Sequence, residues 1–146
     1  MIPVQKPVSQ ITRDTLGYKQ NNPGNIRNQG DVFNGEVQSS NSFKSFSRMM
    51  YGYRAMAKLF FTYFNRGDNT LRKLIATYSP PNENNTEKYI YDVSQDSGIS
   101  PNRILTKRDF TNGNVKKIIR SVSNQEISYV DESELSLGYN EFLKGI

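Results

Sequence analysis

The stretch Gln20-Asn21-Asn22-Pro23-Gly24-Asn25-Ile26-Arg27 is predicted to form a turn, and the prediction of the other elements starts from it. Pro23 fixes φ, Gly24 permits a positive φ, and the asparagines can bond to the nearby backbone. Phe33 to Val37 then alternates apolar and polar residues, as a strand does, and Phe43 to Phe46 is its natural antiparallel partner. The sequence therefore predicts a turn followed by a small sheet, with Glu36 on the polar face.

Residues after 46 follow helical periodicity. The longest helix is expected from Arg48 to about Asn65, capped by Ser47, with a broad apolar stripe typical of a central core helix. Further helices are expected after Asn69 or Thr70, after the cap Thr86, at Ser100-Pro101, from about Asn114 to Gln125, and from Asp131 to Leu143. The predicted class is mainly α (α+β), with one small antiparallel β-sheet.

The expected organisation is an N-terminal arm, residues 1–17, and a single domain, residues 18–146. Pro3 and Pro7 break regular structure in the arm. Within the domain, seven apolar residues should be buried together around the central helix: Met56, Phe60, Leu74, Ile75, Ile90, Ile118 and Ile119.

The amino-acid composition limits the chemistry. The chain has no cysteine and no histidine, which excludes disulfides, a thiol nucleophile, a Cys/His zinc site and a Ser-His-Asp arrangement. If the protein is an enzyme, Asp, Glu, Lys or Tyr must transfer the proton, and a carboxylate is the favoured choice. We expect no metal site and no cofactor.

The net charge of +5 favours an anionic polymer as partner, either nucleic acid or a bacterial cell wall. The basic residues are scattered and match no nucleic-acid signature, which makes nucleic acid the less favoured partner. No apolar run approaches the ~20 residues of a membrane span, and Met1 to Lys6 lacks a signal-peptide core. We therefore expect synthesis in the cytoplasm, followed by delivery to the wall by another agent or carriage in a phage particle.

Two glutamates are candidate catalytic residues. Glu126 follows Val122 by four residues, on the apolar stripe at the end of the helix from Asn114. Apolar neighbours and the negative end of the helix dipole both disfavour the anion there, as a general acid requires. If the helix instead frays at Asn124, Glu126 is solvated. Glu36 is the candidate assisting carboxylate. The alternative is that Glu36 is an ordinary solvated residue of the strand, with no role in catalysis.

Candidate substrate-binding side chains are amides and rings. Asn22 and Asn25 could bond sugar hydroxyl and N-acetyl groups, although asparagine in a turn is usually structural. Tyr78 and Tyr89 could stack on sugar rings, although core packing is the more common role.

Two segments carry a resemblance to a known family. Asn22-Pro23-Gly24-Asn25-Ile26-Arg27, with Gly35-Glu36 and Phe43-Lys44-Ser45-Phe46, resembles a lysozyme-like family of bacteria and bacteriophages, similar to the autolysin glucosaminidases. The second segment is Pro80-Pro81-Asn82-Glu83-Asn84-Asn85-Thr86 with Tyr89-Ile90. The resemblance implies a lysozyme-like helical domain, and since the hairpin precedes the Glu126 helix, a circular permutation of the usual order. It also adds Arg27 and Asn85 to the candidate binding residues.

The resemblance implies a peptidoglycan-cleaving glycosidase: a muramidase, a glucosaminidase or a lytic transglycosylase. Glu126 would be the general acid and Glu36 the assisting carboxylate, facing each other across a cleft. The family usually has His before the Glu and Asn-Gly after it, where this chain has Gln125 and Ile127-Ser128. Two alternatives stay open, a non-catalytic virion structural protein that keeps the fold and binds other phage proteins, and a basic nucleic-acid-binding module.

Overall fold

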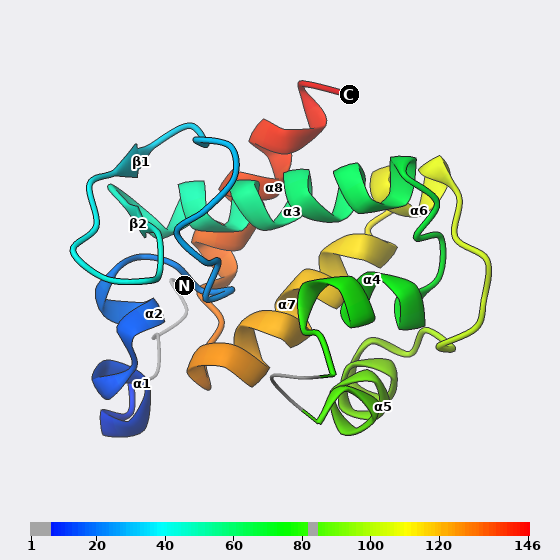
Figure 1. The fold of residues 1–146 in the computed structure, drawn as a ribbon, viewed down its shortest axis with the longest axis horizontal. Helices are drawn as coiled ribbons and strands as arrows, with labels where there is room; N and C mark the ends of the chain where they lie inside the picture. The colour runs from blue at the N-terminus through cyan, green and yellow to red at the C-terminus, as the bar shows by residue number, and fades with distance from the viewer. Residues whose placement is uncertain (1–6, 82–84) are drawn as a thin grey trace, which may run out of the picture.

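The computed structural model describes residues 7–81 and 85–146, and it shows a helical protein with one small sheet (Figure 1). Helix α3 (Met49–Asn65) crosses the middle of the molecule, and α7 (Asn114–Ile127) and α8 (Glu132–Leu143) pack against it. The other elements are α1 (Gln10–Asp14), α2 (Leu16–Lys19), β1 (Glu36–Val37), β2 (Ser45–Phe46), α4 (Leu71–Tyr78), α5 (Thr86–Ser97) and α6 (Lys107–Thr111). The predicted mainly α fold with one small antiparallel sheet is confirmed.

The core forms around α3. Tyr53, Met56 and Phe60 follow the helical spacing i, i+3, i+7 and are completely buried. The seven residues predicted to share the core are all buried with at most 2% of their surface exposed, which confirms that α3 was oriented correctly from the sequence. One face of α3 is thus fixed inward, and its opposite face is free to form part of a surface site.

Two of the predicted helix caps are wrong and one is confirmed. Helix α3 begins at Met49 with Arg48 at the N-cap position, so the predicted Ser47 cap is wrong. Helix α5 is capped by Asn85, whose side chain accepts from the Lys88 N–H at 3.1 Å, so Thr86 is the first helical residue. The Thr70 cap of α4 is confirmed.

Ser100-Pro101 does not start a helix. The Pro101 carbonyl accepts from the Arg72 N–H at 3.0 Å, and the Leu105 N–H donates to the Asn69 carbonyl at 2.8 Å. The segment is therefore docked onto the start of α4, where it satisfies an N–H of the first turn. The next helix, α6, begins only after Thr106.

The N-terminal segment contains α1 and α2 from residue 10 onward. The Thr12 hydroxyl donates to the Ser128 carbonyl at 3.0 Å, which ties α1 to the end of α7. Residues 1–6 of the predicted arm and residues 82–84 of the predicted polar loop lie outside the described residues. The division at residue 17 stays a prediction.

Asp109 organises the start of α6. Its carboxylate accepts from the Thr106 N–H at 2.8 Å, from Asn114 at 2.8 Å and from Arg103 at 2.6 Å. Burial alone would raise the pKa of Asp109, but the hydrogen bonds from Asn114 and Thr106 and the charge of Arg103 hold it below its usual value. Because the folded pKa is lowered, this stabilisation is present above the unfolded pKa and is lost as the pH falls through the folded pKa.

Asp109→Asn is therefore expected to destabilise the protein at pH 7 by about 1–2 kcal/mol. The difference from the parent should shrink as the pH falls below about 4. Urea unfolding of both proteins at pH 7 and pH 3 measures it, with the exposed Asp96→Asn as control. A deficit of the same size at both pH values would mean that the charge of Asp109 contributes nothing.

Candidate active site around Glu126

Glu126 lies in the last turn of α7, which continues to Ile127. The helix has not frayed at Asn124, so the alternative of a solvated Glu126 beyond the helix end is excluded. Its side chain is half-buried, next to the fully buried Ile127. The carboxylate is thus fixed by the helix and only partly open to solvent.

Both carboxylate oxygens of Glu126 accept a hydrogen bond. The Asn25 amide donates to Oε1 at 2.9 Å, and the Tyr89 hydroxyl donates to Oε2 at 2.7 Å. The donors come from the turn and from α5, so three segments distant in the sequence meet at one carboxylate. Such a held carboxylate has a fixed orientation, which acid–base catalysis requires.

The turn reaches Glu126 because of its backbone geometry. Asn25 has a left-handed φ of 49°, a conformation that asparagine tolerates better than most residues. Gly17 in α2 lies directly against it, since a Cβ on Gly17 would stand 2.5 Å from Asn25 Oδ1 and 2.7 Å from a methyl carbon of Ile127. The missing side chain at position 17 lets α2, the turn and α7 meet.

Tyr89 and Tyr78 are both part of this site. Burial raises the pKa of Tyr89 far above its usual value, and the charge of Glu126 adds to the effect, so the hydroxyl keeps its proton and remains a hydrogen-bond donor to Glu126. The Tyr78 hydroxyl donates to the Gly24 carbonyl, and its ring stacks on Phe60 with 5.1 Å between centroids. Burial and the charge of Glu126 likewise raise the pKa of Tyr78.

A cleft of about 1070 Å³ opens beside Glu126. One wall is α3, another is the end of α4 with Ser79 and Pro80, and the turn and the loop after it complete the cleft. The lining residues are 24–27, 29–33, Phe43, Lys58, Leu59, Thr62, Tyr63, Arg66, 77–80 and Glu126. Of the predicted site residues, the structure thus brings Glu126, Asn25, Arg27 and Tyr78 to one cleft, and Tyr89 bonds to Glu126 without lining the cleft.

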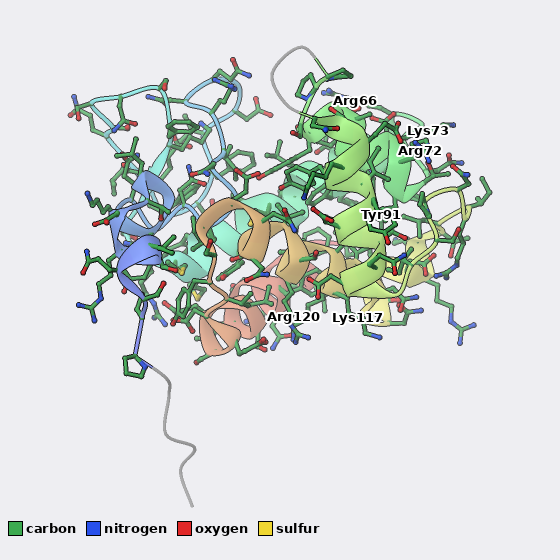
Figure 2. The ribbon with its side chains drawn as sticks, turned by 90° about the horizontal axis from the view of Figure 1, so that it is seen from below. Arg66, Arg72, Lys73, Tyr91, Lys117 and Arg120 are labelled. Carbon is green, nitrogen blue, oxygen red and sulfur yellow. The ribbon has the colours of Figure 1, made fainter. Side chains whose placement is uncertain are left out.

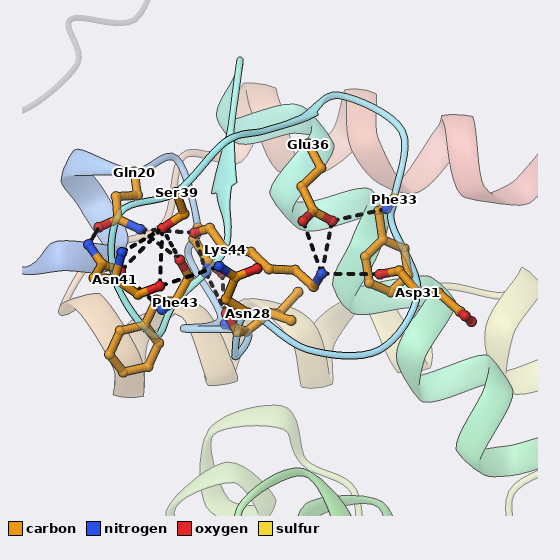
Figure 3. A network of polar contacts seen from close by, with 11 residues as sticks. Gln20, Asn28, Asp31, Phe33, Glu36, Ser39, Asn41, Phe43 and Lys44 are labelled. Carbon is orange, nitrogen blue, oxygen red and sulfur yellow. Dashed lines mark hydrogen bonds and ion pairs between the residues drawn. The ribbon is translucent and has the colours of Figure 1, made fainter.

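Glu36 is placed differently from the prediction. Its carboxylate pairs with the Lys44 ammonium, 2.9 Å from Oε1, and also accepts from the Phe33 N–H at 3.1 Å (Figure 3). The Lys44 side chain is 2% exposed and that of Glu36 11% exposed, and Glu36 does not line the cleft. The predicted polar face is thus wrong here: Gly35 has a φ of 76°, which interrupts the alternation and turns Glu36 inward.

Two predicted binding residues have structural roles instead. Asn22 is completely buried, where its amide donates to the carbonyls of Ile26 and Lys44, both at 2.9 Å. Asn85 caps α5 and does not line the cleft. Arg27 lines the cleft, with its guanidinium carbon 5.9 Å from the centre of the Phe43 ring.

Sequence reasoning missed several polar residues of the cleft, among them Asp31, Lys58 and Ser79. The Ser79 hydroxyl is buried and has no hydrogen-bond partner within residues 7–81 and 85–146, which is unusual for a buried polar atom. Only Lys58 gave a sequence signal, because it shares a helical face with Thr62 and Arg66 at spacings of four.

The described residues contain no group of three or more acidic side chains placed to hold a metal ion. No helix in that part of the chain is long and apolar enough to cross a membrane.

Comparison with known proteins places the chain among bacteriophage proteins. No model of a known protein family matches it. Protein P5 of Pseudoalteromonas phage PM2 is 32% identical over an alignment of 108 residues, which covers 70% of this chain and 68% of P5. The chain belongs to the family of protein P5.

Proposed function

We propose that the protein is a phage-type peptidoglycan-cleaving glycosidase with Glu126 as its general acid. The observation that carries the proposal is the Glu126 carboxylate, held by Asn25 and Tyr89 at the side of a large polar cleft. The absence of histidine and cysteine leaves a carboxylate as the natural proton donor. The lysozyme-like resemblance of residues 22–27 and 80–90 supports the substrate class, with a permuted order of hairpin and helix.

The proposed mechanism begins with proton transfer from Glu126 to the glycosidic oxygen as the bond to the sugar carbon breaks. Tyr89 and Asn25 then donate to the carboxylate that remains, which stabilises the negative charge. Asp31 also lines the cleft and could activate a water or stabilise positive charge on the sugar. Glu36, held by Lys44, is less suited to the assisting role proposed from the sequence.

Incubation of the purified protein with insoluble peptidoglycan tests this function. We expect soluble muropeptides to appear, and their mass separates a hydrolysed reducing end from an anhydro end. A hydrolysed product requires an activated water and would favour the two-carboxylate mechanism. No release of fragments from peptidoglycan at any pH between 4 and 8 would refute the proposal.

Tyr89→Phe tests whether Tyr89 positions Glu126. Loss of the hydroxyl removes the donor to Oε2, and we expect about a tenfold lower kcat with little change in KM. If the Tyr89 ring instead stacks on a sugar, the variant should keep the kcat and the KM of the parent, because phenylalanine keeps the ring. Initial rates of fragment release over a range of peptidoglycan concentrations distinguish the two.

A non-catalytic virion protein is the second candidate. It is favoured by the relationship to protein P5, a phage protein whose name states no enzymatic activity. In that case the purified protein releases no fragments but is found in phage particles by mass spectrometry. A nucleic-acid-binding module is disfavoured, because Arg48, Arg72 and Arg120 each form an ion pair with a glutamate. In the glycosidase proposal the protein is made in the cytoplasm and is either delivered to the wall by another agent or carried in a phage particle.

A further inference from the structure

The cleft beside Glu126 has a basic wall on α3. Lys58 and Arg66 both line the cleft, are exposed, and stand two helical turns apart with Thr62 between them, about 12 Å along the helix axis. Arg27, on the turn that forms another part of the cleft, is a third cation in its lining. We name Lys58 and Arg66, with Thr62 between them, the α3 wall.

The two cations of the α3 wall have no acidic partner in the described residues, as is also true of Arg108 and Lys117, but only the former two line the cleft. Arg48, Arg72, Arg103 and Arg120 form ion pairs with acidic residues at 2.6–2.9 Å. Lys58 and Arg66 form no ion pair within the described part of the chain. Arg66 also caps the C-terminal end of α3, where a positive charge is favourable, but this does not explain Lys58, two turns earlier.

We propose that the α3 wall binds carboxylates carried by the glycan in the cleft, namely those of the peptide stems of peptidoglycan. This inference rests on the proposed function and adds a substrate preference: glycan that carries acidic peptides over neutral glycan of the same linkage. Exposed amine and guanidinium groups at separate points of a cleft can each pair with a carboxylate. Asp31 lines the same cleft and would repel such a group, so the contact is assigned to the α3 side.

Binding to insoluble peptidoglycan tests the inference, with Glu126→Gln as parent so that the substrate is not degraded. The peptidoglycan is first extracted with hydrofluoric acid, which removes attached phosphate polymers, and one half is then converted to neutral amides with carbodiimide and ammonia. We expect Glu126→Gln to bind amidated material about three- to tenfold more weakly in a co-sedimentation assay, the range for two exposed ion pairs. Adding Lys58→Ala and Arg66→Ala should weaken binding to untreated material by a similar factor and remove the effect of amidation.

The matched control is Arg108→Ala with Lys117→Ala in the same parent. It lowers the net charge by the same amount, and both residues are exposed and outside the cleft. Figure 2 shows Lys117 well separated from Arg66. We expect the control to bind like its parent, and the melting temperature of each variant shows that the fold is kept.

Three results would overturn the inference: equal binding of Glu126→Gln to untreated and amidated material, an equal loss in the control variant, or binding that disappears on hydrofluoric acid extraction. The last result would identify phosphate polymers as the anion. Failure of the proposed function is a separate observation, since it appears as no fragment release by the unmutated protein.

Discussion

Replacing Glu126 with glutamine is expected to lower the rate of peptidoglycan cleavage about 10²- to 10⁴-fold, the range for removing a general acid. Glutamine has the same size and cannot donate a catalytic proton. Its amide can still bond to Asn25 and Tyr89, because the Asn25 side chain can present its oxygen and the Tyr89 hydroxyl its hydrogen. The fold should therefore survive while the activity does not.

Glu132→Gln is the control for this experiment. Glu132 is an exposed carboxylate that pairs with Arg120 and lies outside the cleft. Its loss should leave the rate of fragment release and the melting temperature nearly unchanged. Full activity in Glu126→Gln would refute the catalytic role, and an inactive unmutated protein would favour the virion structural protein.

Replacing Glu36 with leucine is expected to lower the free energy of unfolding by about 3–5 kcal/mol, the cost of leaving a buried charge without its partner. The charge in question is the Lys44 ammonium, on a side chain that is 2% exposed. It would keep the Asp31 carbonyl at 3.1 Å and lose both carboxylate oxygens. Denaturant unfolding measures the change.

A double variant separates a structural Glu36 from a catalytic one. Glu36→Leu with Lys44→Met removes both charges and should recover most of the lost stability, since apolar pairs often replace a buried ion pair without loss. If Glu36 is structural, the double variant also regains cleavage activity. A stable but inactive double variant would instead support Glu36 as the assisting carboxylate.

Helical periodicity predicted most of the fold. The stripe from Tyr53 to Phe60 identified the central helix, and the spacing Val115, Ile118, Ile119 and Val122 identified α7, because burial of one face leaves a regular pattern in the sequence. The start at Ser100-Pro101 was wrong because hydrogen bonds from Arg72 to that segment, 29 residues away, override a local signal.

The site was only partly predictable, for a physical reason. Glu126 and Asn25 stand in distinctive local patterns, but their contact depends on how α2 and the turn pack on α7. The burial of Lys44 could not be predicted, because lysine is rarely buried without a partner. Its partner, Glu36, was expected on the polar face, and the positive φ of Gly35 that turns it inward is visible only in the structure. Asp31 and Ser79 lie in connecting segments where a single polar residue carries no pattern.

The hydrogen bond between Asn25 and Glu126 joins residues 101 positions apart, and the one between Thr12 and Ser128 joins residues 116 apart. Contacts of such separation form late in folding, because a long loop must close before they add any stability. During translation, the carboxylate and its two donors cannot come together until α7 has left the ribosome. The nascent chain therefore lacks an assembled site until Asn114–Ile127 has been made.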